Sequence, residues 1–378
     1  MRRLHFALLS LVLVLAAQPL FATTYYVSTN QPPVPCASEK SGWVVFPSIQ
    51  YAVTHVPEGA IINICPGTYS EQVTISRPLT LQGVSYGNSS HVVIAMPGAL
   101  TTTPSLLFGT VAAQVEVTAG PVNVTGITVD GTASSSNCPS GWYVGIFYSS
   151  GSSGTVNGVQ ARYQNCNFVN GVGILAENGH DPSKSVTIKN SYIHDNGEDG
   201  LAAYGASLTA SMEHNDVEDE VVAIFQQAAD GSVSGNTVIN ASTAGIVLYA
   251  GVVSDNTVGG VSILTAGGGT ITYTDDDGID VYGASTVTSN HISNSTYYGI
   301  RLLTGGATIT SNIITSNGLN EGGLEFPVGI GFGCFTNTVS GNVINGTATG
   351  IEFVPAAFKG VNAFYSVPTI NYEGGGGC

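Results

Sequence analysis

The chain has 378 residues, of which 43% are apolar and 9% charged, and 25 acidic against 9 basic residues give a net charge of -16. A surface this acidic repels nucleic acid and anionic lipid at long range, so we expect neither as a partner. The 49 glycines could suggest disorder, but the apolar fraction predicts a packed core instead.

The N-terminus has the pattern of a cleaved secretory signal. Arg2 and Arg3 precede an apolar run from Leu4 to Ala17, and small residues follow near Ala22. The run is too short for a stable transmembrane span, and no later run is long enough to cross a membrane. We therefore expect residues 1–22 to be removed and a secreted or cell-surface monomer to remain. The remaining chain has 7 basic and 25 acidic residues, a net charge of -18.

Six cysteines follow the predicted signal, which fits an oxidising compartment. They fall in three local groups, and no C-x-x-C or His-Cys cluster supports the alternative of a zinc site. We expect the disulfides Cys36–Cys65, Cys138–Cys166 and Cys334–Cys378.

An asparagine recurs in segments such as TIKNSYI, VSGNTV and TSNII, at intervals of 20 to 34 residues. The members are Asn190, Asn215, Asn236, Asn256, Asn290, Asn312 and Asn342, with Asn165 as a looser first member. A unit this short cannot bury its own apolar face, so it must stack on its neighbours. Turn asparagines in stacked coils hydrogen-bond to one another, and we assign them a structural role.

A small residue followed by an aliphatic one comes about eight to ten residues after most of these asparagines. The aliphatic members are Ile174, Leu201, Ile224, Ile246, Ile279, Ile300, Ile330 and Ile351. Segments such as GIVLYA and GIDVYG alternate at period two and are rich in Val, Ile and Tyr, which predicts short strands. We expect these aliphatic residues to form one buried column.

These repeats resemble the right-handed parallel β-helix proteins of the pectin lyase-like superfamily, which includes pectate lyases and polygalacturonases. Ser48–Val84, with its Pro-Gly-Thr-Tyr turn, looks like the usual entry of that fold: a short capping helix followed by the first coils. The resemblance implies an all-β solenoid of roughly twelve coils. It also implies an N-terminal cap over residues 23–58, the β-helix over 59–355, and a C-terminal cap or tail over 356–378. The same fold carries unrelated activities.

Outward positions of the Gly-Ile strand are the places where function can lie. Equivalent outward positions of successive coils form columns. The first outward column contains Asp280 and Arg301 on adjacent coils. The second outward column is predicted to bind sugar through Glu177, Tyr204, Gln227, Tyr249 and Tyr282. Neighbours in a column should lie about 4.8 Å apart. Exposed tyrosines suit the apolar face and hydroxyl rim of a sugar. The alternative is that stacked tyrosines merely stabilise the sheet.

Two long insertions flank this region, with 22 residues between Asn256 and Gly278 and 17 between Asn312 and Gly329. We expect them to wall a cleft over Asp280 and Arg301. The first insertion ends in Asp275, Asp276 and Asp277, which form a candidate calcium site, and calcium is the one cofactor that the sequence suggests. The alternative is a solvated acidic turn.

Two functions remain open from these residues. The first is a hydrolase or lyase acting on an extracellular polysaccharide, with Asp277 or Asp280 as the acid or base and Arg301 orienting the substrate. The polygalacturonase signatures Asn-Thr-Asp, Gly-His-Gly and Arg-Ile-Lys are absent from the sequence, and Arg301 is the one base candidate for a lyase near the cleft. The second is a non-catalytic surface or adhesive module.

Overall fold

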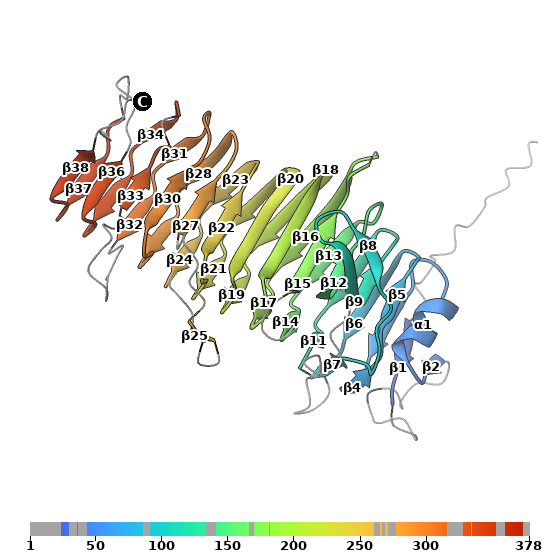
Figure 1. The fold of residues 1–378 in the computed structure, drawn as a ribbon. Coiled ribbons are helices and arrows are strands. Elements are labelled where there is room, and N and C mark those ends of the chain that lie inside the picture. Colours follow the sequence, from blue (N-terminus) through green and yellow to red (C-terminus); the bar gives the residue numbers. More distant parts are fainter. Residues whose placement is uncertain are drawn as a thin grey trace, which may run out of the picture.

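The chain forms an elongated rod of stacked coils, with the N-terminal elements at one end and β38 at the other (Figure 1). This computed structural model describes residues 24–29, 36, 44–85, 91–132, 141–165, 170–180, 182–260, 265–266, 269–270, 277–315, 328–333, 335–352 and 360–372. The predicted signal, residues 1–22, lies outside the described residues. In the part of the chain that is described, no helix is long and apolar enough to span a bilayer.

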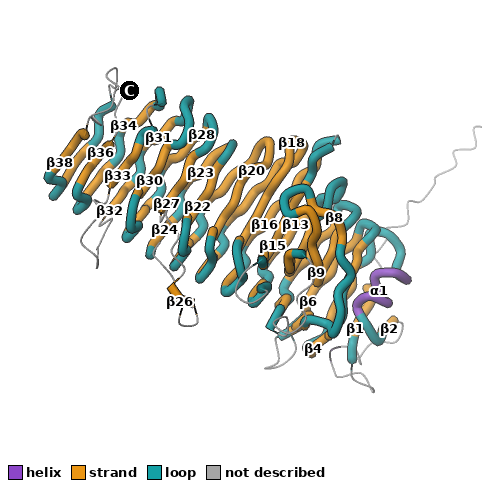
Figure 2. The backbone as a smooth tube through the Cα atoms, in the orientation of Figure 1, coloured by secondary structure: helices purple, strands orange, loops and turns teal. Residues whose placement is uncertain are grey.

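Parallel strands form the faces of the rod (Figure 2). One 24-stranded sheet supplies two faces, which we call sheet 1 and sheet 2, and a 12-stranded sheet supplies the third, sheet 3. Sheet 1 contains β5 (Val73–Ile75), β9 (Gly109–Val117), β12 (Trp142–Tyr148), β15 (Gly171–Glu177), β18 (Asp199–Glu213), β20 (Val222–Ser234), β22 (Ala244–Leu248), β27 (Asp277–Val281), β30 (Tyr298–Leu302), β33 (Val328–Gly331), β36 (Thr349–Glu352) and β38 (Thr369–Tyr372). Sheet 2 contains β2 (Val44–Phe46), β1 (Thr24–Val27), β3 (Ile61–Ile64), β6 (Leu79–Gly83), β10 (Val122–Thr125), β13 (Gly154–Asn157), β16 (Lys184–Lys189), β23 (Gly251–Ser254), β28 (Ser285–Thr288), β31 (Thr308–Thr310) and β34 (Thr338–Ser340). The long strands β18 and β20 continue from sheet 1 into sheet 2 and join the two.

Sheet 3 contains β4 (Gly67–Ser70), β7 (Val92–Ala95), β11 (Thr128–Asp130), β14 (Gln160–Arg162), β17 (Tyr192–His194), β19 (Asp216–Glu218), β21 (Thr237–Ile239), β24 (Thr257–Gly259), β29 (His291–Ser293), β32 (Ile313–Thr315), β35 (Val343–Asn345) and β37 (Ala363–Tyr365). Two strand pairs are antiparallel: β8 (Thr103–Ser105) with β9, and β25 (Thr265–Ala266) with β26 (Gly269–Thr270). Each coil therefore contributes one short strand to each face, as a solenoid requires.

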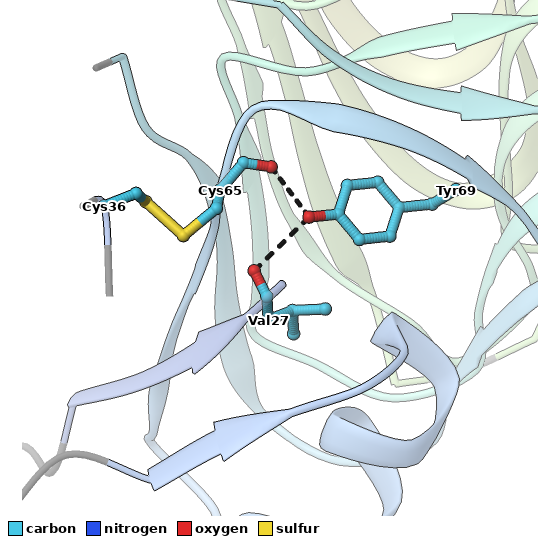
Figure 3. Close-up of a disulfide and its surroundings, with 4 residues drawn as sticks. All are labelled: Val27, Cys36, Cys65 and Tyr69. Atoms are coloured by element: carbon cyan, nitrogen blue, oxygen red, sulfur yellow. Dashed lines mark hydrogen bonds between the residues drawn. A yellow bond between two sulfur atoms is a disulfide. The ribbon is translucent and has the colours of Figure 1, made fainter. Parts of the chain in front are cut away.

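A short helix caps the N-terminal end. Helix α1 (Ile49–His55) begins at Ser48, whose side chain accepts a hydrogen bond from the Tyr51 N–H. The predicted Cys36–Cys65 disulfide is confirmed, and it lies beside Tyr69, whose hydroxyl donates to the Cys65 and Val27 carbonyls (Figure 3). The other predicted pairs involve Cys138, Cys166, Cys334 and Cys378, which lie outside the described residues.

The predicted aliphatic column is confirmed. Its members are all 0% exposed and pair in register from coil to coil: Ile174, Leu201, Ile224, Ile246, Ile279, Ile300, Ile330 and Ile351. Close packing between coils explains why glycine precedes the aliphatic residue. A Cβ at Gly278 would lie 2.5 Å from both the Gly299 carbonyl oxygen and Ile292 Cγ2, so the adjacent coil leaves room for hydrogen alone.

Asparagines stack along one corner of the rod, as predicted, but the membership differs from the prediction at its ends. Each side-chain oxygen in the ladder accepts from the backbone N–H and side-chain amide of the preceding member. The members are Asn215, Asn236, Asn256, Asn290, Asn312, Asn342 and Asn362. Asn190 was wrongly included: it occupies the left-handed turn position before the ladder, with φ 51°, and Ser191 takes its place.

The outward side of sheet 1 is not uniformly exposed. Around β8, Leu107 and Phe108 pack onto an apolar cluster on the outward side of the N-terminal coils, and Phe108 stacks on Trp142. The covered residues are Val111, Ala113, Val144, Phe147, Val172, Leu175 and Ala202. We call the segment from Ser105 to Phe108 the overlay. It covers the N-terminal half of the face that the sequence predicts to be functional, so a site on sheet 1 is restricted to later coils.

Candidate functional site

The strand register brings the three predicted catalytic residues together on the outward face of sheet 1. Asp277 and Asp280 lie on β27, and Arg301 lies on the adjacent strand β30, where it pairs in register with Asp280. Because β27 and β30 each begin one residue before the Gly-Ile pair of their coil, equivalent residues align across the sheet. Asp277 and Asp280 are nevertheless buried, at 0% and 4% exposure.

Asp277 is the centre of the cluster. Its Oδ2 atom lies 3.1 Å from Arg301 Nη1, and its Oδ1 atom accepts from the Tyr298 N–H at 3.1 Å. We expected Arg301 to pair with Asp280, its neighbour in the column, and the structure shows an ion pair of Arg301 with Asp277. The guanidinium group reaches diagonally across the sheet, because its side chain is longer than the spacing between strands.

Burial raises the pKa of Asp277. The neighbouring Asp280 side chain, the charge of Arg301 and the hydrogen bond from the Tyr298 N–H oppose that rise. Asp277 is thus a buried carboxyl group whose negative charge Arg301 balances.

The network continues to two residues that the sequence analysis missed. The Tyr298 hydroxyl donates to Glu352 Oε2 at 3.1 Å, and the Arg301 guanidinium lies 5.7 Å from the centre of the Tyr298 ring. Burial, and then the charge of Glu352, raises the pKa of Tyr298, and burial also raises the pKa of Glu352. A Cβ at Gly331 would lie 2.3 Å from the Tyr298 ring, so the missing side chain there lets Tyr298 reach Glu352 two coils away.

Tyr249 and Tyr282 flank this network on the other side. Their rings stack, with centroids 4.7 Å apart and planes 8° from parallel, and Phe225 lies 5.8 Å from Tyr249 on the previous coil. Burial and the charge of Asp280 raise the pKa of Tyr249. Each ring covers one face of the other, so the pair forms one stacked aromatic surface beside the acidic cluster.

The remaining predicted sugar-binding residues lie farther toward the N-terminus of the rod. Glu177, Tyr204 and Gln227 pair in register on β15, β18 and β20. Glu177 is 2% exposed, and its carboxylate accepts hydrogen bonds at 2.6 to 3.0 Å from the overlay, donated by Ser105 Oγ and the N–H groups of Leu106 and Leu107. Glu177 thus fixes the overlay onto sheet 1, while Tyr204 and Gln227 remain half-buried beyond its edge.

The predicted calcium site and cleft walls lie largely outside the described residues. This applies to Asp275, Asp276 and most of both long insertions. Among the residues that are described, no group of three or more His, Cys, Asp or Glu side chains could hold a metal ion.

Comparisons with known proteins agree with the architecture. Residues 118–284 match the family model described as a right-handed β-helix region. No curated protein matches the chain in sequence.

Solved structures resemble the whole rod at low sequence identity. The GH136 lacto-N-biosidase of Eubacterium ramulus is 11% identical, with 92% of this chain and 67% of that chain covered and a TM-score of 0.64. The A-module of the Azotobacter vinelandii mannuronan C-5 epimerase AlgE6 is 16% identical, with 86% and 90% covered and a TM-score of 0.53. PfbA, a surface adhesin of Streptococcus pneumoniae, is 13% identical, with 86% and 85% covered and a TM-score of 0.53. The chain therefore has a right-handed parallel β-helix fold, as predicted.

Proposed function

We propose that this protein binds an extracellular polysaccharide on the outward face of sheet 1, across β22, β27, β30, β33 and β36. The observation that carries this proposal is the cluster of the buried carboxyl groups of Asp277 and Asp280 with Arg301, which pairs with Asp277, on the same face as the stacked rings of Tyr249 and Tyr282. Carboxyl, guanidinium and phenol groups together offer the directional donors and acceptors that sugar hydroxyls need. The fold is shared with a lacto-N-biosidase, a mannuronan epimerase and an adhesin, so it accommodates both catalytic and binding roles.

The charge of the chain favours a neutral glycan. A net charge of -16 repels a polyuronate at long range, and the positive charge of Arg301 is already balanced by Asp277. The sugar would meet a hydrogen-bonding surface with no net positive charge. We therefore expect a neutral polysaccharide to bind in preference to a polyuronate.

Acid-catalysed cleavage is the second candidate, and the burial of Asp277 favours it. Burial raises the pKa of this carboxyl group, as a general acid requires. Cleavage also needs a second carboxyl group at the separation of a glycosidase, about 5–5.5 Å for retention or about 6.5–9.5 Å for inversion, whereas binding needs none.

Asp280→Asn tests the proposal, because the asparagine amide can still donate a hydrogen bond to Asp277 but carries no transferable proton. The purified protein would be screened on a panel of neutral and acidic polysaccharides, with and without a chelator, for binding and for released products. We expect Asp280→Asn to weaken binding by about 1–3 kcal/mol or to abolish cleavage. Asp216→Asn, an exposed acid on sheet 3, is the matched control and should behave as the wild type.

Three outcomes are decisive. If the wild type releases no products and Asp280→Asn binds more weakly than the wild type, the protein is a binding module. If the wild type releases products and Asp280→Asn does not, while Asp216→Asn still does, the protein is an enzyme. Unchanged binding and turnover in Asp280→Asn, with an unchanged melting temperature, would remove this cluster as the site.

A further inference from the structure

Sheet 2 carries an unusual surface at its C-terminal end, on a different face from the candidate site. The outward residues of β28, β31 and β34 are all hydroxyl-bearing, and we call them the hydroxyl face: Thr286, Thr288, Thr308, Thr310, Thr338 and Ser340. Between them, Val287, Ile309 and Val339 point into the core and are at most 1% exposed. Segments 284–289, 306–311 and 337–341 contain no charged residue, although the chain is strongly acidic.

The hydroxyl face is a regular two-dimensional array. Its residues pair in register from strand to strand and form two rows. One row contains Thr286, Thr308 and Thr338, and the other contains Thr288, Thr310 and Ser340. Neighbours lie roughly 4.7–4.9 Å apart across the strands and roughly 6.6–6.8 Å apart along them. β23, β28, β31 and β34 lie side by side in Figure 1.

The asparagine ladder keeps this array regular. Asn290, Asn312 and Asn342 follow the three strands by two residues, and their ladder hydrogen bonds are 2.9 to 3.0 Å long. Since the ladder is buried and repeats with nearly constant geometry, the spacing of the coils beside it is fixed. The hydroxyl groups therefore lie on a rigid lattice.

Strand propensity alone does not account for this composition. Threonine suits β-strands, so an excess of threonine is expected on any outward face. The same three coils, however, place mixed residues at the equivalent outward positions of sheet 3: His291, Ser293, Ile313, Thr315, Val343 and Asn345. The restriction to hydroxyl groups is thus particular to sheet 2.

The hydroxyl face is a regular, uncharged array, and this limits the ligands that it can bind. Small molecules are held in concave sites, whereas an open, regular array gains affinity from a ligand that is itself periodic, because many weak contacts then form together. Each threonine offers a methyl group and a hydroxyl that both donates and accepts, so the array can continue a hydrogen-bonded water lattice. The hydroxyl face contains no aromatic side chain, the group best suited to the faces of sugar rings.

We propose that the hydroxyl face binds the surface of ice. Ice repeats in two directions at distances of a few ångströms, and its water molecules are already ordered, so a rigid array does not bear the entropy cost of immobilising them. The protein would attach to growing ice crystals and slow their growth. This activity goes beyond the proposed polysaccharide binding and uses another sheet, so either can fail without the other.

Ice recrystallisation in a frozen sucrose solution tests the proposal, with an equal concentration of serum albumin as the inert reference. We expect the wild type to slow crystal coarsening, and Thr308→Lys, which places a long charged side chain in the middle of the array, to require at least about tenfold more protein for the same effect. Thr257→Lys, an exposed threonine on sheet 3, is the matched control and should act as the wild type. Thr338→Lys, at an exposed position on the face, serves as a second variant if Thr308→Lys does not fold.

A second measurement uses the wild type alone: fluorescently labelled protein should accumulate on a single ice crystal grown in its solution. Coarsening as fast as with albumin, together with no fluorescence on the crystal, would overturn the proposal. So would equal activity of Thr308→Lys and Thr257→Lys when both are folded. Binding to cellulose or chitin powder that is lost in Thr308→Lys, without an effect on ice, would assign the face to crystalline polysaccharide instead.

Discussion

Asn290→Ala tests whether the asparagine ladder stabilises the rod. Asn290 is 1% exposed, and its side-chain oxygen accepts the Asn256 N–H at 3.0 Å while its amide donates to the Val253 carbonyl at 3.1 Å. Alanine leaves the buried Asn256 N–H without its acceptor, at a cost of about 1–3 kcal/mol, and removes a donor from Val253, at a cost of about 0.5–1.5 kcal/mol. The Asn256 amide keeps its bonds to Val233 and Ser254. We therefore expect a loss of about 1.5–4.5 kcal/mol in the free energy of unfolding.

Urea unfolding followed by circular dichroism measures this loss, with Asn345→Ala as the matched control. Asn345 is an exposed asparagine on β35, so its replacement should change stability by no more than about 0.5 kcal/mol. A loss below about 1 kcal/mol for Asn290→Ala, or one equal to that of the control, would refute the reasoning. The aliphatic columns would then hold the coils together without the ladder.

Three further predictions concern the core, the buried acids and the cap. Gly278→Ala should cost about 1–3 kcal/mol, because its Cβ would contact the next coil, whereas Gly98→Ala, with nothing within 4 Å, should be tolerated; denaturant titration compares them. Burial raises the pKa of Glu220, so its stabilising contribution is complete below its ordinary pKa and is lost as the pH rises through the higher folded value. Glu220→Gln keeps the acceptor for Asn196 and should raise the melting temperature at neutral pH but not at acidic pH; an equal shift at both would contradict the burial argument. Reducing Cys36–Cys65 should destabilise the protein by about 2–4 kcal/mol, and an unchanged melting temperature with reductant would show that the cap does not need it.

The interior of the rod could be predicted from sequence because it repeats. The Gly-Ile pairs fix the register, and each inward aliphatic residue then falls into one column. The first member of the asparagine ladder was harder to predict, because asparagine also suits the left-handed turn position that Asn190 occupies. Serine replaced asparagine in the ladder at that coil, and Asn362 extended it at the other end, where no Gly-Ile pair marks the strand.

The candidate site was predictable only in part. Register placed Asp280 beside Arg301, but the ion pair depends on the reach of the arginine side chain toward Asp277, which a column of neighbours does not describe. The Tyr298–Glu352 contact joins residues 54 positions apart and passes over Gly331. The overlay that binds Glu177 comes from a segment about 70 residues earlier that carries none of the repeat pattern, so nothing in the sequence indicated that it covers sheet 1.

Inward and outward positions of the coils have different roles, so the effect of a substitution depends on the side of the strand on which it lies. Inward columns and the ladder are buried and constrained by the next coil, so most changes there affect stability. Outward positions that no other segment covers contact mainly their neighbours in the same column, and the two surfaces proposed here differ in how far they depart from that pattern. The hydroxyl face keeps it, since each residue pairs with its equivalent, whereas Asp277 is a buried carboxyl on an outward face, held by Arg301 and Tyr298. A buried charge of this kind costs free energy unless it is compensated, so its presence on an otherwise simple repeat argues for function rather than for stability.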